Sequence, residues 1–300
     1  MVDFSAESFG KFIVAGEHSV LRGAPALVFP LKSKSLKISF QSDPQSSFQT
    51  KFGGACGADL QLLFCGVLHR SEELLGFAIR DQKKARGVLT IESDLPIGAG
   101  LGASAALCVA VARFLVYLDL LKDQDVAQFA RNLENLFHGE SSGVDVAVAV
   151  SGTPLVFEKV GRRDLFVPRW QPRWYLSYSG QRGLTKECVD KVKSWMMQNP
   201  VRGQELDLQM ADSVAGAMSE LQQNSNEKSL KNLVQAMNAA GQCFVEWGLV
   251  SDQLMAHMNQ LKQAGALAVK PTGSGGGGYA LSLWDQQPPE NLLPDLISCF

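Results

Sequence analysis

Hydrophobic residues in the first half of the chain follow two different spacings. Short β-type runs are separated by Gly, Pro and Ser, as is typical of strands and turns. The strands expected from this pattern are 12–15, 26–29, 36–40 and 88–91. In other stretches hydrophobic residues recur at three- and four-residue steps, which predicts helices. The helices expected are 60–79, 104–121 and 126–137, and the polar, glycine-rich stretch 41–57 predicts a loop.

The pattern becomes mostly helical after a charged stretch that contains Pro168 and Pro172. The helices expected here are 185–198, 205–223, 228–248 and 251–263, with Gly265 as the residue that ends the last of them. The strands expected are 174–178, 266–269 and 279–284. This mixture predicts an α+β protein of two domains, residues 1–167 and 168–300, because 300 residues exceed the usual size of one core.

Composition excludes some classes of partner. The chain has 28 Lys and Arg against 30 Asp and Glu and no long basic run, which argues against a nucleic-acid partner bound through phosphate charge. The six cysteines form no CxxC pair and the N-terminus has no hydrophobic core of signal-peptide length, so we expect reduced thiols and a cytoplasmic protein. Arg113 and Asp119 interrupt the hydrophobic helix 104–121, so no membrane span is expected.

A glycine-rich stretch, Pro96–Ala106 (PIGAGLGASAA), lies between an expected strand and the hydrophobic helix. Glycines at alternate positions let backbone N–H groups converge on an anion, and the helix that follows adds the positive end of its dipole. The alternative is a tight strand-to-helix turn in which Ser104 is only an N-cap. The pattern favours binding of a nucleoside triphosphate.

A second glycine-rich stretch, Lys270–Tyr279 (KPTGSGGGGY), lies between two expected strands. Such a run is often a flexible linker. Its position inside the chain favours close backbone packing beside the first loop and the phosphates, where any Cβ would obstruct.

Four motifs in order resemble those of the GHMP family of small-molecule kinases, and within it the mevalonate kinases. Gly10–Gly23 (GKFIVAGEHSVLRG) is similar to G-K-x-x-x-x-G-E-H-x-V-x-x-G. Pro96–Ala106 is similar to P-x-G-A-G-L-G-S-S-A-A, His138–Asp145 (HGESSGVD) to H-G-x-x-S-G-x-D, and Lys270–Gly278 to K-x-T-G-A-G-G-G-G. The resemblance covers the chain from end to end. It implies an N-terminal domain similar to domain 2 of ribosomal protein S5 and a ferredoxin-like C-terminal domain.

The resemblance assigns catalytic roles to Asp145, as acceptor of the substrate's hydroxyl proton, and to Lys11, as a fixed positive charge beside it. Ser104 and Glu134 correspond to the family's Mg²⁺ ligands, and a hydroxyl and a carboxylate oxygen suit a hard cation. Without the motifs, Asp145 could be a helix cap, Lys11 solvated surface and Glu134 an exposed helix carboxylate. Ala103 departs from the serine that is commonest at its position. The implied ATP-binding residues are Pro96, Gly98, Ala99, Gly100, Leu101, Gly102, Ala103, Ser104, Gly273, Ser274 and Gly275.

The implied substrate-binding residues are Lys11, Glu17, His18, Asp145 and Thr185. His18 could instead be a satisfied core histidine, and Thr185 could also be the N-cap of the helix that follows it. Residues 146–150 alternate as in a strand, whereas the family places a helix here, and we follow the family. Arg182 and Lys186 are candidates for steering an anionic substrate, or are ordinary solvated charges.

The resemblance implies ATP- and Mg²⁺-dependent phosphorylation of (R)-mevalonate to 5-phosphomevalonate, the first phosphorylation of the mevalonate route to isoprenoids. Members of the family are often homodimers, so a homodimer is an expectation. Three alternatives remain at this point. They are a GHMP kinase for phosphomevalonate or a sugar, a decarboxylase of the same superfamily, and a non-catalytic sensor on this fold.

Overall fold

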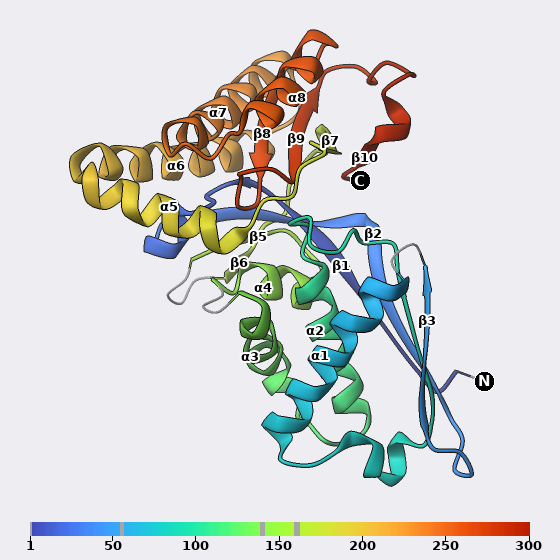
Figure 1. Ribbon diagram of the computed structural model, residues 1–300. Coiled ribbons are helices and arrows are strands. Elements are labelled where there is room, and N and C mark those ends of the chain that lie inside the picture. The colour runs from blue at the N-terminus through green and yellow to red at the C-terminus, as the bar shows by residue number, and fades with distance from the viewer. Residues whose placement is uncertain (1, 55–56, 139–141, 159–162) are drawn as a thin grey trace. The chain divides into compact units, whose positions relative to one another are not determined.

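The computed structural model describes residues 2–54, 57–138, 142–158 and 163–300 (Figure 1). They form two compact units, the first comprising the chain up to Lys11 and Lys34–Gly152, the second Phe12–Ser33 and Thr153–Phe300. Strands β1 (Phe4–Ala15) and β2 (Ala26–Ser42) contribute to both units. The two predicted domains, 1–167 and 168–300, are consecutive parts of the chain. The two units are not, because the chain passes between them more than once.

The first unit packs helices against a small sheet. The second part of β2 pairs antiparallel with β4 (Gly87–Ser93), from Leu36 opposite Ser93 to Ser42 opposite Gly87. β3 (Phe48–Gly54) pairs with β4 in parallel. The helices of this unit are α1 (Gly57–Leu75), α2 (Ala103–Tyr117), α3 (Val126–His138) and α4 (Val144–Ser151).

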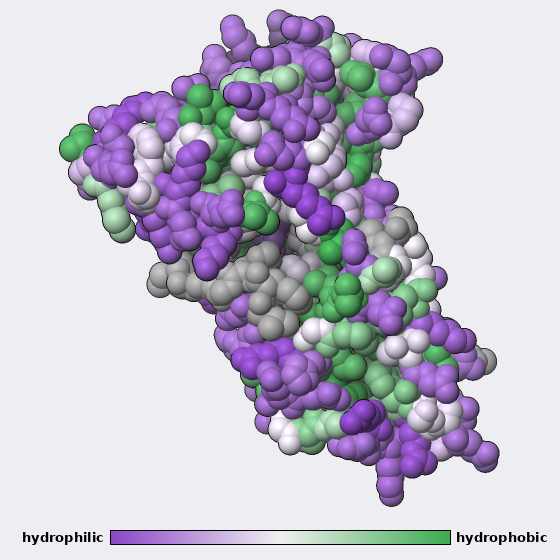
Figure 2. Space-filling model, in the orientation of Figure 1, coloured by the Kyte–Doolittle hydropathy of each residue, from purple (hydrophilic) through white to green (hydrophobic). Residues whose placement is uncertain are grey.

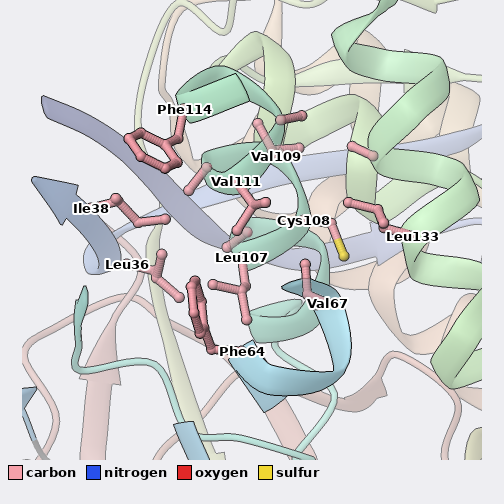
Figure 3. Close-up of a cluster of buried hydrophobic side chains, with 14 of the residues drawn as sticks. Leu36, Ile38, Phe64, Val67, Leu107, Cys108, Val109, Val111, Phe114 and Leu133 are labelled. Atoms are coloured by element: carbon pink, nitrogen blue, oxygen red, sulfur yellow. The ribbon is translucent and has the colours of Figure 1, made fainter. Parts of the chain in front are cut away.

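The core of the first unit lies between this sheet and α2. Alternate residues of β2 (Leu36, Ile38 and Phe40) are buried, as period-2 alternation requires of a strand with one covered face. Helix α2 is buried around nearly its whole circumference, because α1, α3 and α4 contact it as well. Figure 3 shows side chains of β2, α1, α2 and α3 gathered in this cluster. The fully buried α2 begins at the first glycine loop, so the loop is fixed to a rigid element.

The second unit contains an antiparallel sheet in the order β10-β7-β9-β8. Its strands are β7 (Arg173–Tyr178), β8 (Ala268–Thr272), β9 (Tyr279–Trp284) and β10 (Leu296–Ser298). Two short strands, β5 (Leu155–Phe157) and β6 (Arg163–Leu165), extend the pairing of the first part of β2. The helices are α5 (Thr185–Gln198), α6 (Pro200–Leu221), α7 (Glu227–Glu246) and α8 (Asp252–Gln263), of which α7 and α8 contact β8.

Most of the predicted elements are confirmed. The expected helix 185–198 and strand 279–284 coincide with α5 and β9. The helix expected from the family at 146–150 is also found, as α4. Gly265 follows α8 with a φ of 109°, in the left-handed region expected just after a helix.

Two predictions were wrong. The stretch 41–57, expected as a loop, contains β3, whose polar residues are tolerated because they lie on an exposed strand. The strands expected at 26–29 and 36–40 are one continuous strand, β2. Its polar centre resembles a turn in the sequence, but it lies where the pairing changes from β5 to β4.

The surface seen in Figure 2 is mainly hydrophilic, with hydrophobic residues in small separate patches. Hydrophobic side chains that are more than half exposed include Met197, Val201 and Leu208 on α5 and α6. Within the described parts of the chain, every helix is too short or too polar to span a lipid bilayer.

Candidate active site

The first glycine loop, residues 94–102, connects β4 to α2. Gly98, Gly100 and Gly102 have φ of 71°, 83° and 80°, all in the left-handed region that favours glycine. Gly102 is the N-cap of α2, and its carbonyl accepts the hydrogen bond of the Ala106 amide at 2.9 Å. Ser104 is the second residue of the helix, so its predicted alternative role as N-cap is wrong. The loop thus leads directly into the positive end of a buried helix dipole.

Lys11 and Asp145 meet beside this loop. The Lys11 Nζ lies 3.3 Å from Asp145 Oδ1, with the lysine side chain 5% and the aspartate side chain 25% exposed. The Lys11 amide donates to the Leu101 carbonyl at 2.9 Å, which fixes β1 to the loop. The alternative of a solvated Lys11 is therefore wrong. The ion pair lies at the N-terminus of α2, and its carboxylate is partly exposed.

Asp145 is held by α4. The N-cap of α4 is Gly143, with a φ of 85°, so Asp145 lies in the first turn and is not the cap. The Arg113 guanidinium of α2 donates to the Val150 carbonyl at 2.9 Å and to the Glu7 carbonyl at 3.0 Å. Arg113 therefore ties together α2, the end of α4 and β1, the three elements that carry the loop, the aspartate and the lysine.

Glu134 is 1% exposed on α3, so the alternative of an ordinary exposed carboxylate is wrong. Burial, and secondarily the charge of Glu134, raises the pKa of Cys108 on α2 well above its ordinary value. Ser104 and Cys108 lie one turn apart on the same face of α2. Glu134 therefore faces the part of α2 that carries Ser104, and the half-buried hydroxyl and buried carboxylate form a set of oxygen donors that suits a hard cation.

In the second unit, Glu17 forms a buried ion pair. The Lys270 Nζ lies 2.6 Å from Glu17 Oε1, and the two side chains are 0% and 2% exposed. The same ammonium donates to the carbonyls of Pro271 at 2.6 Å and Ile13 at 3.4 Å. A lysine ammonium has three N–H groups, so these three acceptors use all of them. Glu17 is thus fixed between β1 and β8.

His18 lies next to this pair with a φ of 59°, an uncommon conformation for a residue with a Cβ. Its Nε2 lies 2.9 Å from the Ser274 carbonyl, so Nε2 carries the proton and donates. Its buried Nδ1 has no hydrogen-bond partner among the described residues. Burial lowers the pKa of His18 to about 4, so the ring is neutral at pH 7. As a core histidine, His18 is satisfied at only one nitrogen.

The second glycine loop packs against the segment that precedes α5. The Gly276 amide donates to the Leu249 carbonyl and the Gly278 amide to the Gln181 carbonyl, both at 2.6 Å. A Cβ on Gly183 would lie 2.3 Å from the Gly275 carbonyl oxygen, so these backbones touch. The loop is therefore a packed connection, and the alternative of a flexible linker is wrong; the packing seen here is against the segment before α5.

Thr185 is the first residue of α5, whose N-cap is Leu184, so the predicted alternative role as N-cap is wrong. Its hydroxyl donates to Ser274 Oγ at 3.4 Å. Arg182 and Lys186 are exposed, as solvated charges are.

Sequence reasoning missed Lys270 as a partner of Glu17. The signal is Lys270 itself, a single charge directly after the hydrophobic residues 266–269. The sequence does not show which residue pairs with it. Residues 139–141 of the third motif, His138–Asp145, lie outside the described residues. Among the described residues no group of three or more His, Cys, Asp and Glu could hold a metal ion, so the Ser104 and Glu134 prediction depends on these two protein ligands.

Comparisons with known proteins show which family this chain resembles. Residues 64–153 match the model described as GHMP kinases N terminal domain. The mevalonate kinase of Thermococcus onnurineus is 30% identical over 313 residues, covering 92% of this chain and 88% of the relative. That of Thermococcus sibiricus is 29% identical over 314 residues, with the same coverage. The crystal structure of L. major mevalonate kinase in complex with R-mevalonate superposes with a TM-score of 0.76, 25% identity, and coverage of 95% of this chain and 88% of that one.

The fold and the glycine loop that opens a buried helix are those of a small-molecule kinase of the GHMP class. The 30% sequence identity to the T. onnurineus enzyme extends along most of both chains and identifies the family within this class. The chain belongs to the mevalonate kinase family of the GHMP kinases.

Proposed function

We propose that this protein transfers the γ-phosphoryl group of ATP to the 5-hydroxyl of (R)-mevalonate. The observation that carries the proposal is the Lys11–Asp145 ion pair beside the first glycine loop, in a chain whose relatives are named mevalonate kinases. The related L. major enzyme was solved with R-mevalonate. Phosphoryl transfer requires chiefly positioning and charge stabilisation, which a rigid loop and a fixed ion pair supply.

The loop and the start of α2 would hold the triphosphate. Positive φ at alternate residues is a backbone conformation in which neighbouring amides can converge on an anion, and the helix dipole would add positive potential there. We propose that Pro96 and the residues Gly98–Ser104 bind ATP in this way. Ala103 supplies no hydroxyl, so the contribution of this position is limited to its amide.

Asp145 would orient the attacking hydroxyl and accept its proton as the oxygen bonds to the γ-phosphorus and the bond to ADP breaks. A positioned general base contributes about 10²- to 10⁴-fold to the rate. The ammonium of Lys11, at 3.3 Å, would stabilise the negative charge that shifts during transfer. Its near-complete burial strengthens this effect, because the surrounding dielectric is lower than that of water.

Ser104 and Glu134 would hold Mg²⁺, which supplies charge neutralisation and fixes the orientation of the phosphate oxygens. The buried carboxylate and the hydroxyl at the helix start are oxygen donors of the kind Mg²⁺ uses. In the second unit, Glu17, His18 and Thr185 would contribute to acceptor binding, with the Glu17 carboxylate held by Lys270.

The experiment is a panel of acceptors with purified protein, ATP and Mg²⁺, with release of ADP as the readout. Mevalonate should be turned over at least about 100-fold more efficiently than phosphomevalonate, galactose or other sugars. Efficient turnover of one of those instead of mevalonate would contradict the proposal. Release of carbon dioxide from diphosphomevalonate would favour the decarboxylase. If no acceptor in the panel leads to release of ADP, a non-catalytic sensor would be the better interpretation.

A further inference from the structure

Ser274 belongs to the second glycine loop and contacts His18 and Thr185, two residues predicted to bind the acceptor. Its carbonyl accepts from His18 Nε2 at 2.9 Å, and its hydroxyl accepts from Thr185 at 3.4 Å. The Cys188 thiol, one turn along α5 from Thr185, donates to the next carbonyl, Gly275, at 3.3 Å. Ser274 therefore joins the turn at His18 and the start of α5 within the second unit.

Part of the backbone of the loop around Ser274 is committed to packing within the second unit. The amides of Gly276 and Gly278 are used by the carbonyls of Leu249 and Gln181. A Cβ on Gly277 would lie 2.7 Å from the Gln181 carbonyl oxygen, so the loop and the segment before α5 form one packed piece. The glycines here serve this close packing, which fixes the position of Ser274 relative to Thr185.

The hydroxyl of Ser274 is a departure from the motif K-x-T-G-A-G-G-G-G, which has alanine at this position. Ser274 is half-buried and Thr185 is exposed, so both oxygens remain accessible to a ligand. Each hydroxyl has one proton and two lone pairs. The Ser274 hydroxyl also forms a hydrogen bond with the Cys188 side chain, and its bond with Thr185 is long at 3.4 Å. Lone pairs on both oxygens remain for a ligand that donates, and Thr185 can turn its proton from this long bond to a ligand that accepts.

We propose that Ser274 is a specificity-determining residue that, together with Thr185, binds the 3-hydroxyl of the acceptor. A carboxylate only accepts hydrogen bonds, and it is bound most strongly by cationic donors such as Lys and Arg. A neutral pair of hydroxyls matches another hydroxyl, which can accept from one and donate to the other. This assignment rests on the proposed function and moves Ser274 from the ATP side, where the motif put it, to the acceptor side.

The test compares two acceptors, mevalonate and 5-hydroxy-3-methylpentanoate, which lacks the 3-hydroxyl. Ser274→Ala should lower kcat/KM for mevalonate about 3- to 10-fold, the value of one neutral hydrogen bond, through KM. It should leave kcat/KM for the deoxy acceptor and the KM for ATP unchanged. Ser274→Ala introduces the residue of the motif, so the variant should fold normally.

Two further variants complete the experiment. Ser194→Ala on α5 removes a serine hydroxyl that accepts from Gln198 at 3.2 Å, and it should change neither acceptor. Thr185→Val should reproduce the loss with mevalonate, and the double variant should lose no more than about as much as either single one, because the pair acts as a unit.

The inference is overturned if Ser274→Ala lowers both acceptors equally, which would make its role structural. It is also overturned if only the KM for ATP rises, or if nothing changes. Wild-type protein that does not phosphorylate mevalonate would contradict the proposed function itself, so the two failures are distinguishable.

Discussion

Gly102→Ala tests the coupling between the glycine loop and the Lys11–Asp145 pair. Gly102 has a φ of 80°, and a Cβ at this position would lie 3.0 Å from Lys11 Cγ and 3.8 Å from Asp145 Oδ2. The first distance is too short for an ordinary contact and the second is normal. A methyl group would therefore push on the lysine without touching the aspartate closely.

Two effects of this substitution can be separated by magnitude. Alanine in the left-handed region costs about 1–2 kcal/mol of folding free energy wherever it occurs. The push on Lys11 moves its side chain by a few tenths of an ångström, from an Nζ–Oδ1 distance that is already 3.3 Å. Because a 1 Å misplacement in an active site costs about 100-fold in rate, a shift of a few tenths of an ångström should lower kcat about 3- to 10-fold.

The matched control is Gly76→Ala, after α1. Gly76 has a φ of 77°, and nothing lies within 4 Å of its Cβ position. Urea unfolding should show a loss of about 1–2 kcal/mol for Gly76→Ala from backbone strain alone, and at least as much for Gly102→Ala, which adds the contact with Lys11. Only Gly102→Ala should lose kcat in an ADP-release assay. Equal kcat values for the two variants would refute the idea that the loop positions the lysine.

Three further predictions concern buried ionisable groups. Lys270→Met should lower the free energy of unfolding by about 3–5 kcal/mol in urea, because it leaves the Glu17 carboxylate buried without its cation; Lys270→Met with Glu17→Gln should recover much of this, and no recovery would contradict it. The pKa of His18, lowered by burial to about 4, means that the unfolded chain takes up a proton near pH 6.5 that the folded chain refuses. Stability from this source is complete above pH 6.5 and is lost as the pH falls toward 4, by about 2 kcal/mol at pH 5; His18→Gln should flatten this part of the urea-unfolding profile, and an unchanged profile would exclude His18 as its source. Glu134→Gln should raise the Mg²⁺ concentration for half-maximal activity at least about tenfold, whereas Glu73→Gln, at an exposed helix position, should not; equal Mg²⁺ curves would remove Glu134 from the metal site.

Local signals predicted most of the elements, and the limits have physical causes. Helices such as α5 and α8 have clear three- and four-residue spacing, so a single sequence identifies them. The strands β5, β6 and β10 have three residues each and form by pairing with distant strands, which no local pattern reveals. The continuity of β2 likewise depends on its two partners.

The site was predicted through the motifs and not through spacing. Lys11 and Asp145 are far apart in the sequence, and only the resemblance suggested that they meet, as the ion pair in the first unit now shows. The resemblance gave no partner for Lys270, because its pairing with Glu17 follows from the packing of β8 beside β1. Similarly, the contact between Thr185 and Ser274 arises from glycine packing that the sequence records only as a run of small residues.

The most direct test of the account is a single-turnover measurement with Asp145→Asn, which keeps the shape of the side chain and removes its charge. With ATP, Mg²⁺ and mevalonate, the rate of 5-phosphomevalonate formation should fall at least about 100-fold, while ATP still binds. Phosphoryl transfer by Asp145→Asn at the wild-type rate would contradict the central claim that this carboxylate, paired with Lys11, activates the acceptor.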